Sequence, residues 1–328
     1  MANPTIYPAN LSWLGMAKET TYGTPVATPT IWVPLLDPAW KPDLKMLENV
    51  AMYGDMAETH GIVAGVRHDT LGYKTYLFLD TLYPHMLTVL GNPDTLSGGS
   101  DPYTHKTALY NGGNGQPVSW TLSLYNGAET WQMAGSIISK VDATLKADAL
   151  GELQVEWMGL PATKVTNPTN TPSTAKPWAS WNTTITVNGV QATSYSDIKL
   201  NYTRKTEVVQ TADGTQSPYV IFVGPLTVEG DVTGVYQGYS GTPTDLSNYL
   251  TNGQVPVTVQ VNPVGDATHY AKWQHTLVGF TASEVKAASG KYVEITSKFK
   301  GIANSTDALG GGLSPVQFVL LNAVSAAY

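Results

Sequence analysis

The stretch IISKVDATLKADALGELQVEWMG, residues 137–159, decides the fold class of this chain. Over 137–148, apolar or small residues alternate with residues that are mostly polar, which predicts a strand with one buried face. A turn over 149–151 follows, and the alternation then continues through 152–157. The two runs therefore predict one long antiparallel hairpin with an apolar face and a polar face.

Several other segments alternate in the same way, and the composition agrees with them. Only 13% of the 328 residues are charged, while Thr, Ser, Gly, Val and Tyr are abundant, which is typical of a β-rich protein with many turns. We therefore predict a mostly β fold dominated by antiparallel sheet. The further predicted strands are 120–125, 198–205, 226–233, 257–261 and 291–300.

Two short segments carry helical signals instead. Residues 80–91 place apolar side chains at three-to-four spacing and end at a glycine, and Pro84 fits this helix only in its first turn. Residues 242–253 repeat this design and also end at a glycine, Gly253. Each segment predicts a short amphipathic helix beside the sheet.

The two halves of the chain show signs of an internal duplication. Trp131-Gln132 recurs as Trp273-Gln274, and each pair precedes a long predicted hairpin. The order of strands, helix and hairpin also recurs, although chance similarity between β segments is the alternative. We predict an N-terminal extended arm plus a first β domain over 1–161, a Pro/Thr-rich linker over 162–181 and a second domain over 182–328.

Bulk properties exclude several classes of function. The chain has no cysteine, which excludes disulfides, thiolate nucleophiles and cysteine-ligated metal sites. Its net charge of −7 repels phosphate backbones, which argues against tight binding of nucleic acid. The N-terminal residues carry no signal for secretion, and the longest late apolar run, 316–324, is too short to cross a bilayer. We expect no membrane partner.

No pattern in the sequence indicates an enzyme. The six histidines form no metal-binding spacing, and no phosphate loop or nucleophile elbow is present, so we predict no catalytic residue, no metal and no cofactor. Glu229 and Asp231 share a strand face and could serve a glycan-active enzyme, which is one alternative. The many tryptophans and tyrosines leave a carbohydrate-binding β-sandwich module or a tail-associated adhesin as another.

Four segments resemble the tail tube (major tail) proteins of long-tailed bacteriophages. The segment GMAKETTYGTPVA at 15–27 looks like the opening of many such proteins, and 183–189, 195–205 and 224–234 are similar to later parts of the family. The resemblance implies two β-sandwich-like tube domains, each with a short flanking helix, whose sheets join across subunits into a ring barrel. It also implies a structural virion protein of the tail tube, assembled in the host cytoplasm.

The resemblance further implies partners and contact residues. The partners are other copies of the chain, the tape measure, terminator and distal tail proteins, and viral DNA as a transient passenger. Two tube domains in one chain favour a trimer as a pseudo-hexamer, with a hexamer as the alternative. We expect an extended arm at 15–26 and long loops at 41–61 and 204–218 to reach neighbours. The predicted contact residues are Lys18, Glu19, Tyr22, Pro25, Glu48, Tyr53, Asp55, Arg204, Glu207 and Asp213.

Carboxylates on the predicted polar faces are candidates for the channel lining, where negative charge would repel the phosphates of passing DNA. Lysines alternate with them, so the sequence does not place a uniformly acidic face. The lumen candidates are Asp142, Asp148, Glu152, Glu156, Glu229, Asp231 and Glu294.

Overall fold

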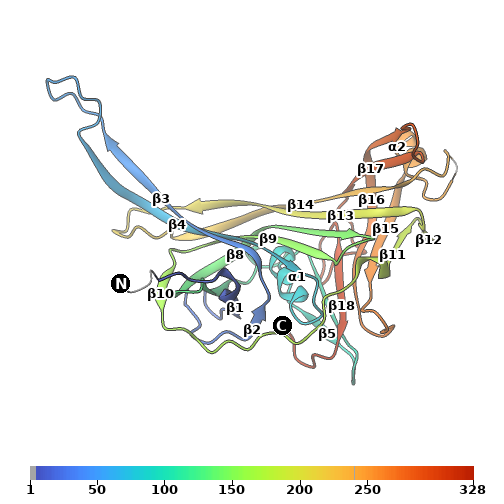
Figure 1. Ribbon diagram of the computed structural model, residues 1–328, viewed down its shortest axis with the longest axis horizontal. Helices are drawn as coiled ribbons and strands as arrows, with labels where there is room; N and C mark the ends of the chain where they lie inside the picture. Colours follow the sequence, from blue (N-terminus) through green and yellow to red (C-terminus); the bar gives the residue numbers. More distant parts are fainter. Residues whose placement is uncertain (1–4, 240) are drawn as a thin grey trace.

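The computed structural model describes residues 5–239 and 241–328 as antiparallel β-sheet with two short α-helices (Figure 1), which confirms the predicted fold class. The helices are α1 (Leu82–Leu90) and α2 (Asp245–Thr251), and the 3-10 turns are η1 (Ala9–Leu11) and η2 (Ser180–Asn182). The strands are β1 (Trp13–Lys18), β2 (Ile31–Val33), β3 (Leu36–Asn49), β4 (Gly61–Tyr76), β5 (Thr95–Ser97), β6 (Tyr103–Ala108), β7 (Trp120–Tyr125), β8 (Thr130–Lys146), β9 (Glu152–Gly159), β10 (Thr163–Val165), β11 (Thr183–Val187), β12 (Val190–Gln191), β13 (Tyr195–Val209), β14 (Val220–Val235), β15 (Gln254–Val261), β16 (Tyr270–Lys286), β17 (Glu294–Gly301) and β18 (Gln317–Asn322).

Eight strands form one continuous antiparallel sheet, which we call the long sheet. Their order is β3–β4–β9–β8–β13–β14–β17–β16. The predicted hairpin at 137–159 lies near its centre as the C-terminal part of β8 paired with β9. The N-terminal parts of β8 and β16 leave the long sheet and pair with β7 and β15, so each of these two strands takes part in two layers.

The same pairing order occurs twice along the chain. The first repeat is β1–β7–β8–β9–β4–β3, and the second repeat is β11–β15–β16–β17–β14–β13. A helix follows β4 in the first and β14 in the second. The bulge after Ile138 in the β8–β9 pair recurs after Phe280 in the β16–β17 pair, so Phe280 of the second repeat corresponds to Ile138 of the first. The structure thus contains a repeat at the level of strand order and bulge position.

The two helices form where the sequence signals predict them. Pro84 lies in the first turn of α1. Backbone N–H groups in a first turn have no acceptor within the helix, so the missing N–H of proline costs no hydrogen bond there. The helix ends at Gly91, whose φ of 88° suits glycine and whose N–H donates to Leu87 O at 2.7 Å. In α2 the left-handed end position is Asn252, with a φ of 53°, one residue before the glycine expected to stop it. Asparagine tolerates this conformation better than most residues.

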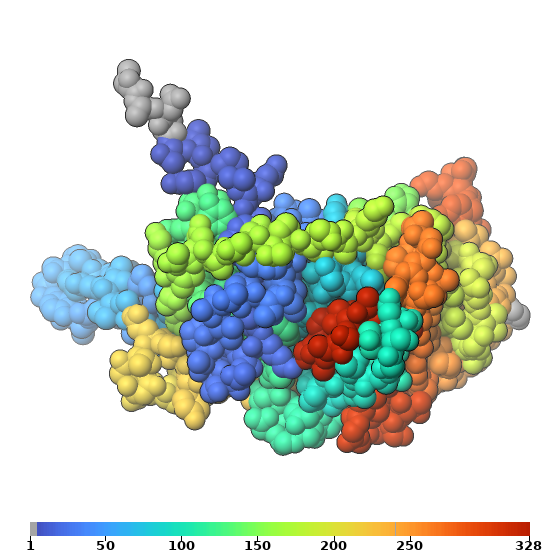
Figure 2. All heavy atoms as spheres, turned by 90° about the horizontal axis from the view of Figure 1, so that it is seen from below, coloured from blue at the N-terminus to red at the C-terminus, as the bar shows by residue number. Residues whose placement is uncertain are grey.

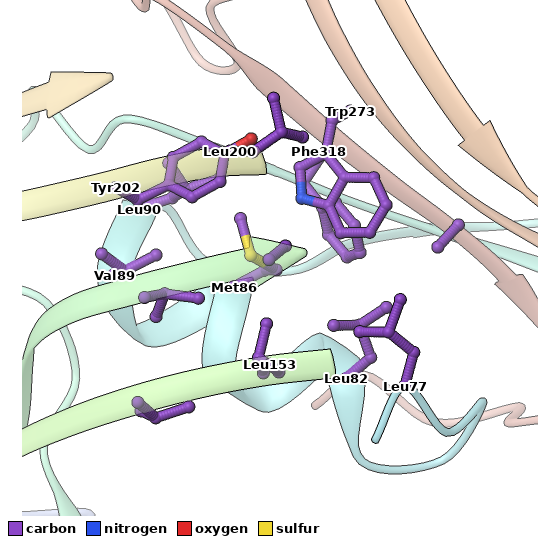
Figure 3. Close-up of a cluster of buried hydrophobic side chains, with 14 of the residues drawn as sticks. Leu77, Leu82, Met86, Val89, Leu90, Leu153, Leu200, Tyr202, Trp273 and Phe318 are labelled. Atoms are coloured by element: carbon purple, nitrogen blue, oxygen red, sulfur yellow. The ribbon is translucent and has the colours of Figure 1, made fainter. Parts of the chain in front are cut away.

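The apolar core runs through both repeats. Figure 3 shows α1 side chains packed against residues from β9, β13, β16 and β18. The tightly buried members of this group share one continuous cluster with the rest of the core. They include Leu82, Met86, Val89, Leu90, Leu153, Leu200, Tyr202, Trp273 and Phe318. Because the core does not divide between the repeats, each repeat contributes to the burial of the other.

The linker at 162–181 is more ordered than its Pro-rich composition suggests. It includes β10, which pairs with β8, and η2. Trp178 is 2% exposed; its N–H donates to Leu77 O at 3.0 Å, and its carbonyl accepts from Gly151 N at 2.9 Å. The linker therefore carries a short strand at one end and a 3-10 turn at the other, and long-range partners hold it against the first repeat.

The helices of the described residues are too short or too polar to cross a bilayer.

Candidate assembly surfaces and polar sheet face

One face of the long sheet carries almost only polar side chains, and we call it the polar face. Along β8, Val141, Ala143 and Leu145 are buried in the core while the residues between them point to the opposite side. The strand register aligns the polar residues into rows across six strands. One row is Lys74, Gln154, Asp142, Asn201, Glu229 and Lys300, and the next is Tyr76, Glu152, Thr144, Lys199, Asp231 and Lys298.

The lysines of the polar face lie beside its carboxylates. Because the pairs are made within or between adjacent strands, positive and negative charges alternate across the sheet and offset one another. The face is therefore mixed in charge rather than uniformly acidic. The pairs are Lys74–Glu152 at 3.0 Å, Lys140–Asp142 at 2.9 Å, Lys199–Asp142 at 3.5 Å, Lys298–Asp231 at 3.7 Å and Lys300–Glu229 at 2.9 Å.

The structure brings most of the lumen candidates onto this one face. Asp142 differs from the other candidates because it is only 3% exposed. It lies between Lys140 and Lys199, which both pair with its carboxylate. Asp148 lies past the end of β8, in the turn before β9, and is exposed. The candidates that share the polar face are Asp142, Glu152, Glu156, Glu229, Asp231 and Glu294.

Both ends of the long sheet are open edges within the described residues. At one end, β3 pairs only with β4. At the other end, β16 pairs with β17 from 278 to 286, but its second partner, β15, stops opposite Gly279. Residues 280–286 thus have a free edge, and unpaired strand edges are templates for another strand. In Figure 1 these two edges belong to opposite ends of the molecule.

A hairpin made of β3 and β4 extends well beyond the body of the molecule (Figure 1). Because β3 continues to Asn49, the long loop expected at 41–61 is reduced to the tip at 50–60. An apolar surface of this kind on a projecting element indicates a contact with another molecule. The exposed apolar residues of the hairpin are Met46, Leu47, Val50, Met52, Tyr53, Met56, Ile62 and Val63.

Three predicted contact residues lie on this hairpin and are exposed. Tyr53 accepts a hydrogen bond from Asn49 Nδ2 at 2.8 Å, and its ring lies 4.3 Å from that of His60. Asp55 faces His60 at 3.4 Å, and Glu48 is the last charged residue of β3. The side chains at the tip therefore give it a local order of its own.

The second long hairpin, β13–β14, departs from its prediction in the same way. Residues 204–209 belong to β13, so the loop expected at 204–218 begins only after Val209. Asp213 organises the tip by accepting from Thr215 N at 3.1 Å, and hydrogen bonds of this kind lower the pKa of its carboxyl group. Glu207 is exposed on β13.

Arg204 is an interior residue of the subunit. It is 5% exposed, and its guanidinium donates to Val89 O at 2.7 Å, Leu90 O at 3.0 Å and Gly224 O at 3.0 Å. Burial lowers the pKa of Arg204 to about 10. Two of these carbonyls end α1, where a cation is favourable. Its prediction as a residue that contacts a neighbour finds no support, because its polar atoms are engaged within the chain.

The segment at 15–26 is not an extended arm. Its first residues form β1, which lies between β2 and β7. Glu19 is 6% exposed and accepts from Ser119 Oγ at 2.6 Å, Thr121 Oγ1 at 2.8 Å and Gly135 N at 2.8 Å. The prediction of an arm was wrong because these partners lie far along the chain from Glu19, where no local pattern reveals them.

The remaining predicted contacts of this segment lie at the surface. Lys18 is exposed and donates to Tyr328 O at 2.7 Å, and Pro25 is exposed. Tyr22 is 37% exposed, and its hydroxyl accepts from Ile221 N at 2.9 Å. Tyr22 therefore ties the segment after β1 to β14 of the second repeat.

Sequence reasoning missed Asp69, which is fully buried at the base of the β3–β4 hairpin. It accepts from Arg67 Nε at 2.8 Å, Trp40 Nε1 at 2.9 Å and Ala162 N at 3.0 Å. These bonds fix β3, β4 and the start of the linker to one another. The signal available in the sequence was a lone aspartate at an inward position of an alternating strand.

No group of histidine, aspartate and glutamate among the described residues is placed to hold a metal ion. His85 and His275 are buried in the core, and burial lowers the pKa of each to about 4. Glu229 and Asp231 face lysines on the polar face.

Comparison with known proteins places these surfaces in context. The chain matches the family model described as phage tail tube protein over residues 9–312, a span that includes both repeats. A comparison with curated proteins gives no match. The match favours a structural role over the adhesin and carbohydrate-binding alternatives. The chain belongs to the phage tail tube protein family and is a structural subunit of a bacteriophage tail tube.

Proposed function

We propose that copies of this chain join through the open edges of the long sheet into rings, and that the rings stack into a hollow conduit for viral DNA. The observation that carries the proposal is the pairing of β8 with β13. Through this pairing, two repeats of the same strand order already share one sheet inside a single chain. Further copies can extend the sheet in the same way, and a closed ring leaves no edge unpaired.

The polar face supports a channel lining. It is the side of the long sheet that the core does not cover, and its lysines are engaged by carboxylates of the same face. DNA phosphates bind proteins mainly through lysine and arginine that neutralise them. Lysines already paired with carboxylates offer phosphates little attraction, so DNA can pass along the face without being held.

The β3–β4 hairpin supports stacking between rings. It projects beyond the body and carries an exposed apolar surface, including Met52 and Met56 at its tip. We infer that this surface is covered by a subunit of the adjacent ring. Glu48, Tyr53 and Asp55 then lie at the contact between rings.

The repeat supports a division into tube domains at 1–161 and 182–328, joined by the linker at 162–181. With two tube domains in each chain, we propose that three chains close one ring as a pseudo-hexamer; six chains in a ring are the alternative. We further propose that the subunit has no enzymatic activity, that it assembles in the host cytoplasm, and that it meets tape measure, terminator and distal tail proteins along the tube and at its ends.

Electron microscopy of the purified chain at rising concentration tests this proposal. The matched variant replaces residues 50–59, at the hairpin tip, by a two-residue Asn-Gly turn. We expect the full chain to form hollow tubes and the variant to form rings that do not stack. Compact monomers of the full chain at every concentration would contradict ring formation, and normal tubes of the variant would contradict the stacking role.

A further inference from the structure

The strands at the β8–β13 contact correspond position by position to the strands at the open edges, which allows the two places to be compared. Bulge positions fix the correspondence, and β8 and β16 share one bulge, after Ile138 and Phe280. The bulge after Leu44 in the β3–β4 pair recurs after Arg204 in the β13–β14 pair, so these two residues also correspond. At the N-terminal end, η1 (Ala9–Leu11) recurs as η2 (Ser180–Asn182), each just before the first strand of its repeat.

The segment of β8 that pairs with β13 has an unpaired counterpart. In β8 this segment is Lys140–Lys146, and its inward residues are buried, with Ala143 1% exposed. Its counterpart in β16 begins at Ala282 and includes Val285, which corresponds to Ala143 and is 39% exposed. The second repeat therefore lacks, at this position, the strand that β13 supplies to the first.

The strand that would fill this position is β3, because it is the counterpart of β13. Leu200 of β13 lies opposite Ala143 and is fully buried, whereas its counterpart Trp40 is only partly buried. In a single chain, β3 has no partner on this edge among the described residues. Both open edges thus expose residues whose counterparts are buried at the β8–β13 contact.

Transferring the β8–β13 register to the open edges predicts which residues face each other. Asn201 lies opposite Asp142 in the chain. Their counterparts are Lys41 and Glu284, so we expect Lys41 of one copy to lie opposite Glu284 of the next on the polar face. The adjacent inward pair is Leu200 opposite Ala143, and its counterparts place Trp40 opposite Val285. Opposite charges and apolar pairs directly across an antiparallel ladder are stabilising. The correspondence between the repeats was derived from bulge positions alone. The opposite charges of Lys41 and Glu284 and the apolar pair of Trp40 and Val285 are therefore independent support for it.

The linker contact has a counterpart as well. Trp178 donates to Leu77 O at 3.0 Å and accepts from Gly151 N at 2.9 Å, beside the β8–β9 turn. Because η1 corresponds to η2, the counterpart of Trp178 is Tyr7, which is aromatic and 57% exposed. Figure 2 shows the segment before β1 standing out from the body. The aromatic residue that is 2% exposed in the linker therefore has a counterpart that is more than half exposed in the segment before β1.

The acceptor site for Tyr7 is present in the second repeat. Tyr236 N donates to Val293 O at 2.9 Å, which repeats the bond from Leu77 N to Gly151 O at 2.8 Å. Beside it, Tyr292 is 57% exposed and Val293 is 39% exposed. By correspondence, Tyr7 N would donate to Tyr236 O, and Val293 N would donate to Tyr7 O.

We propose that the contact between neighbouring copies repeats the contact between the two repeats of one chain, residue for residue. The occupant of both open surfaces is a second copy of this chain: its β3 pairs with the β16 edge, and its Tyr7 docks beside Tyr292. The contact is head-to-tail, as a closed ring requires. This inference rests on the proposed ring and adds its register and its anchoring residue.

Disulfide trapping tests the register, because the chain has no native cysteine. The variant Lys41→Cys/Glu284→Cys is assembled and oxidised. Directly opposite residues suit disulfide geometry, whereas residues displaced by two positions lie about 7–8 Å apart and do not. The matched control is Asp43→Cys/Glu284→Cys, on the same strand face. Asn201→Cys/Asp142→Cys serves as the control for the contact inside one chain.

For Lys41→Cys/Glu284→Cys we expect a series of disulfide-linked oligomers that ends at the closed ring. For Asp43→Cys/Glu284→Cys we expect only slow disulfide formation. A mixture of the two single variants, Lys41→Cys and Glu284→Cys, should stop at covalent dimers. Rings or tubes in which the displaced pair reacts as fast as the predicted pair, or in which neither pair reacts, would overturn the register while leaving ring formation intact. If no rings form at all, both the proposed function and this inference fail.

Replacement of Tyr7 tests the anchoring residue. We expect Tyr7→Ala to raise the concentration needed for assembly about tenfold and Tyr7→Trp, which restores the linker residue, to leave it near the wild-type value. Thermal unfolding of the single subunit should change little, since Tyr7 is 57% exposed. Assembly of Tyr7→Ala at the wild-type concentration would overturn this role. The control is Asn10→Ala, because its counterpart Trp181 is 63% exposed.

Discussion

Asp142 of β8 lies directly opposite Asn201 of β13, at the line where the two repeats of the chain meet. The pair belongs to a row of polar residues that crosses from one repeat to the other without a break. Because the core beneath this row is also continuous, the chain already contains one complete contact of the kind that the proposed ring needs between copies.

Glu19 stabilises the subunit from inside. Replacing it by alanine removes the acceptor for Ser119, Thr121 and the N–H of Gly135, and leaves these donors in a buried site. We expect the free energy of unfolding in urea to fall by about 3 kcal/mol. The exposed neighbour Thr20, replaced by alanine, is the control. If Glu19→Ala left stability unchanged and impaired only assembly, Glu19 would act in a contact with a neighbouring subunit, and its assigned role inside the subunit would be wrong.

Arg204 holds the end of α1. A lysine at this position cannot reach the carbonyls of Val89, Leu90 and Gly224 together, since it lacks the planar fork of guanidinium. We expect Arg204→Lys to lower the free energy of unfolding by about 2–4 kcal/mol. The exposed residue beside it, as Lys205→Ala, should change stability by less than about 0.5 kcal/mol. Equal effects of the two variants would contradict the interior assignment.

The ion pairs of the polar face keep its lysines from phosphates. The variant Glu229→Gln/Asp231→Asn removes the partners of Lys300 and Lys298. We expect assembled variant protein to bind duplex DNA in a fluorescence anisotropy titration, and to bind it about tenfold more weakly at 200 mM than at 50 mM salt.

The control for this experiment is Asp101→Asn/Glu129→Gln, which removes the same charge from residues outside the strands of the long sheet. It should bind DNA no better than the unaltered chain. Equal gains in the two variants would show that net charge, rather than pairing on the polar face, governs DNA binding.

Two buried groups should affect acid stability in opposite directions. Burial lowers the pKa of His275 to about 4, so between pH 6.5 and 4 the unfolded chain binds a proton that the folded chain does not. Stability therefore falls as the pH drops through this window, by about 3 kcal/mol for this histidine. Burial raises the pKa of Asp245 to about 6, so the folded chain binds the extra proton and gains stability as the pH falls from 6 to 4.

Urea unfolding between pH 7 and pH 4 measures both effects. The loss of stability toward acid pH should become smaller in His275→Gln and larger in Asp245→Asn. Changes in the same direction would contradict the assignment of these two groups.

Local patterns in the sequence predicted the parts of the fold that depend on neighbouring residues. Alternation over 137–159 predicted the β8–β9 hairpin, and spacing with terminal signals predicted both helices. The carboxylates of the polar face were predicted because a strand places every second residue on one side. These features need no knowledge of distant partners.

The roles of Glu19, Arg204 and Asp69 could not be predicted in this way. Each is a charged residue with at least one partner far along the chain: a strand for Glu19, the end of α1 for Arg204 and the linker for Asp69. In isolation such residues are indistinguishable from surface charges, which are far more common. The long loops were misassigned for a related reason: polar and Met-rich strands lack the alternation that marks a buried face, so the projecting hairpin looked like a loop.

Electron cryomicroscopy of the assembled chain would show which surface of the subunit lines the channel. We expect a hollow tube of stacked rings, three chains to a ring, with the polar face of the long sheet lining the channel and β3 of each chain paired to β16 of the next. A chain that stays monomeric, or a tube whose channel is lined by any other surface, would contradict this expectation.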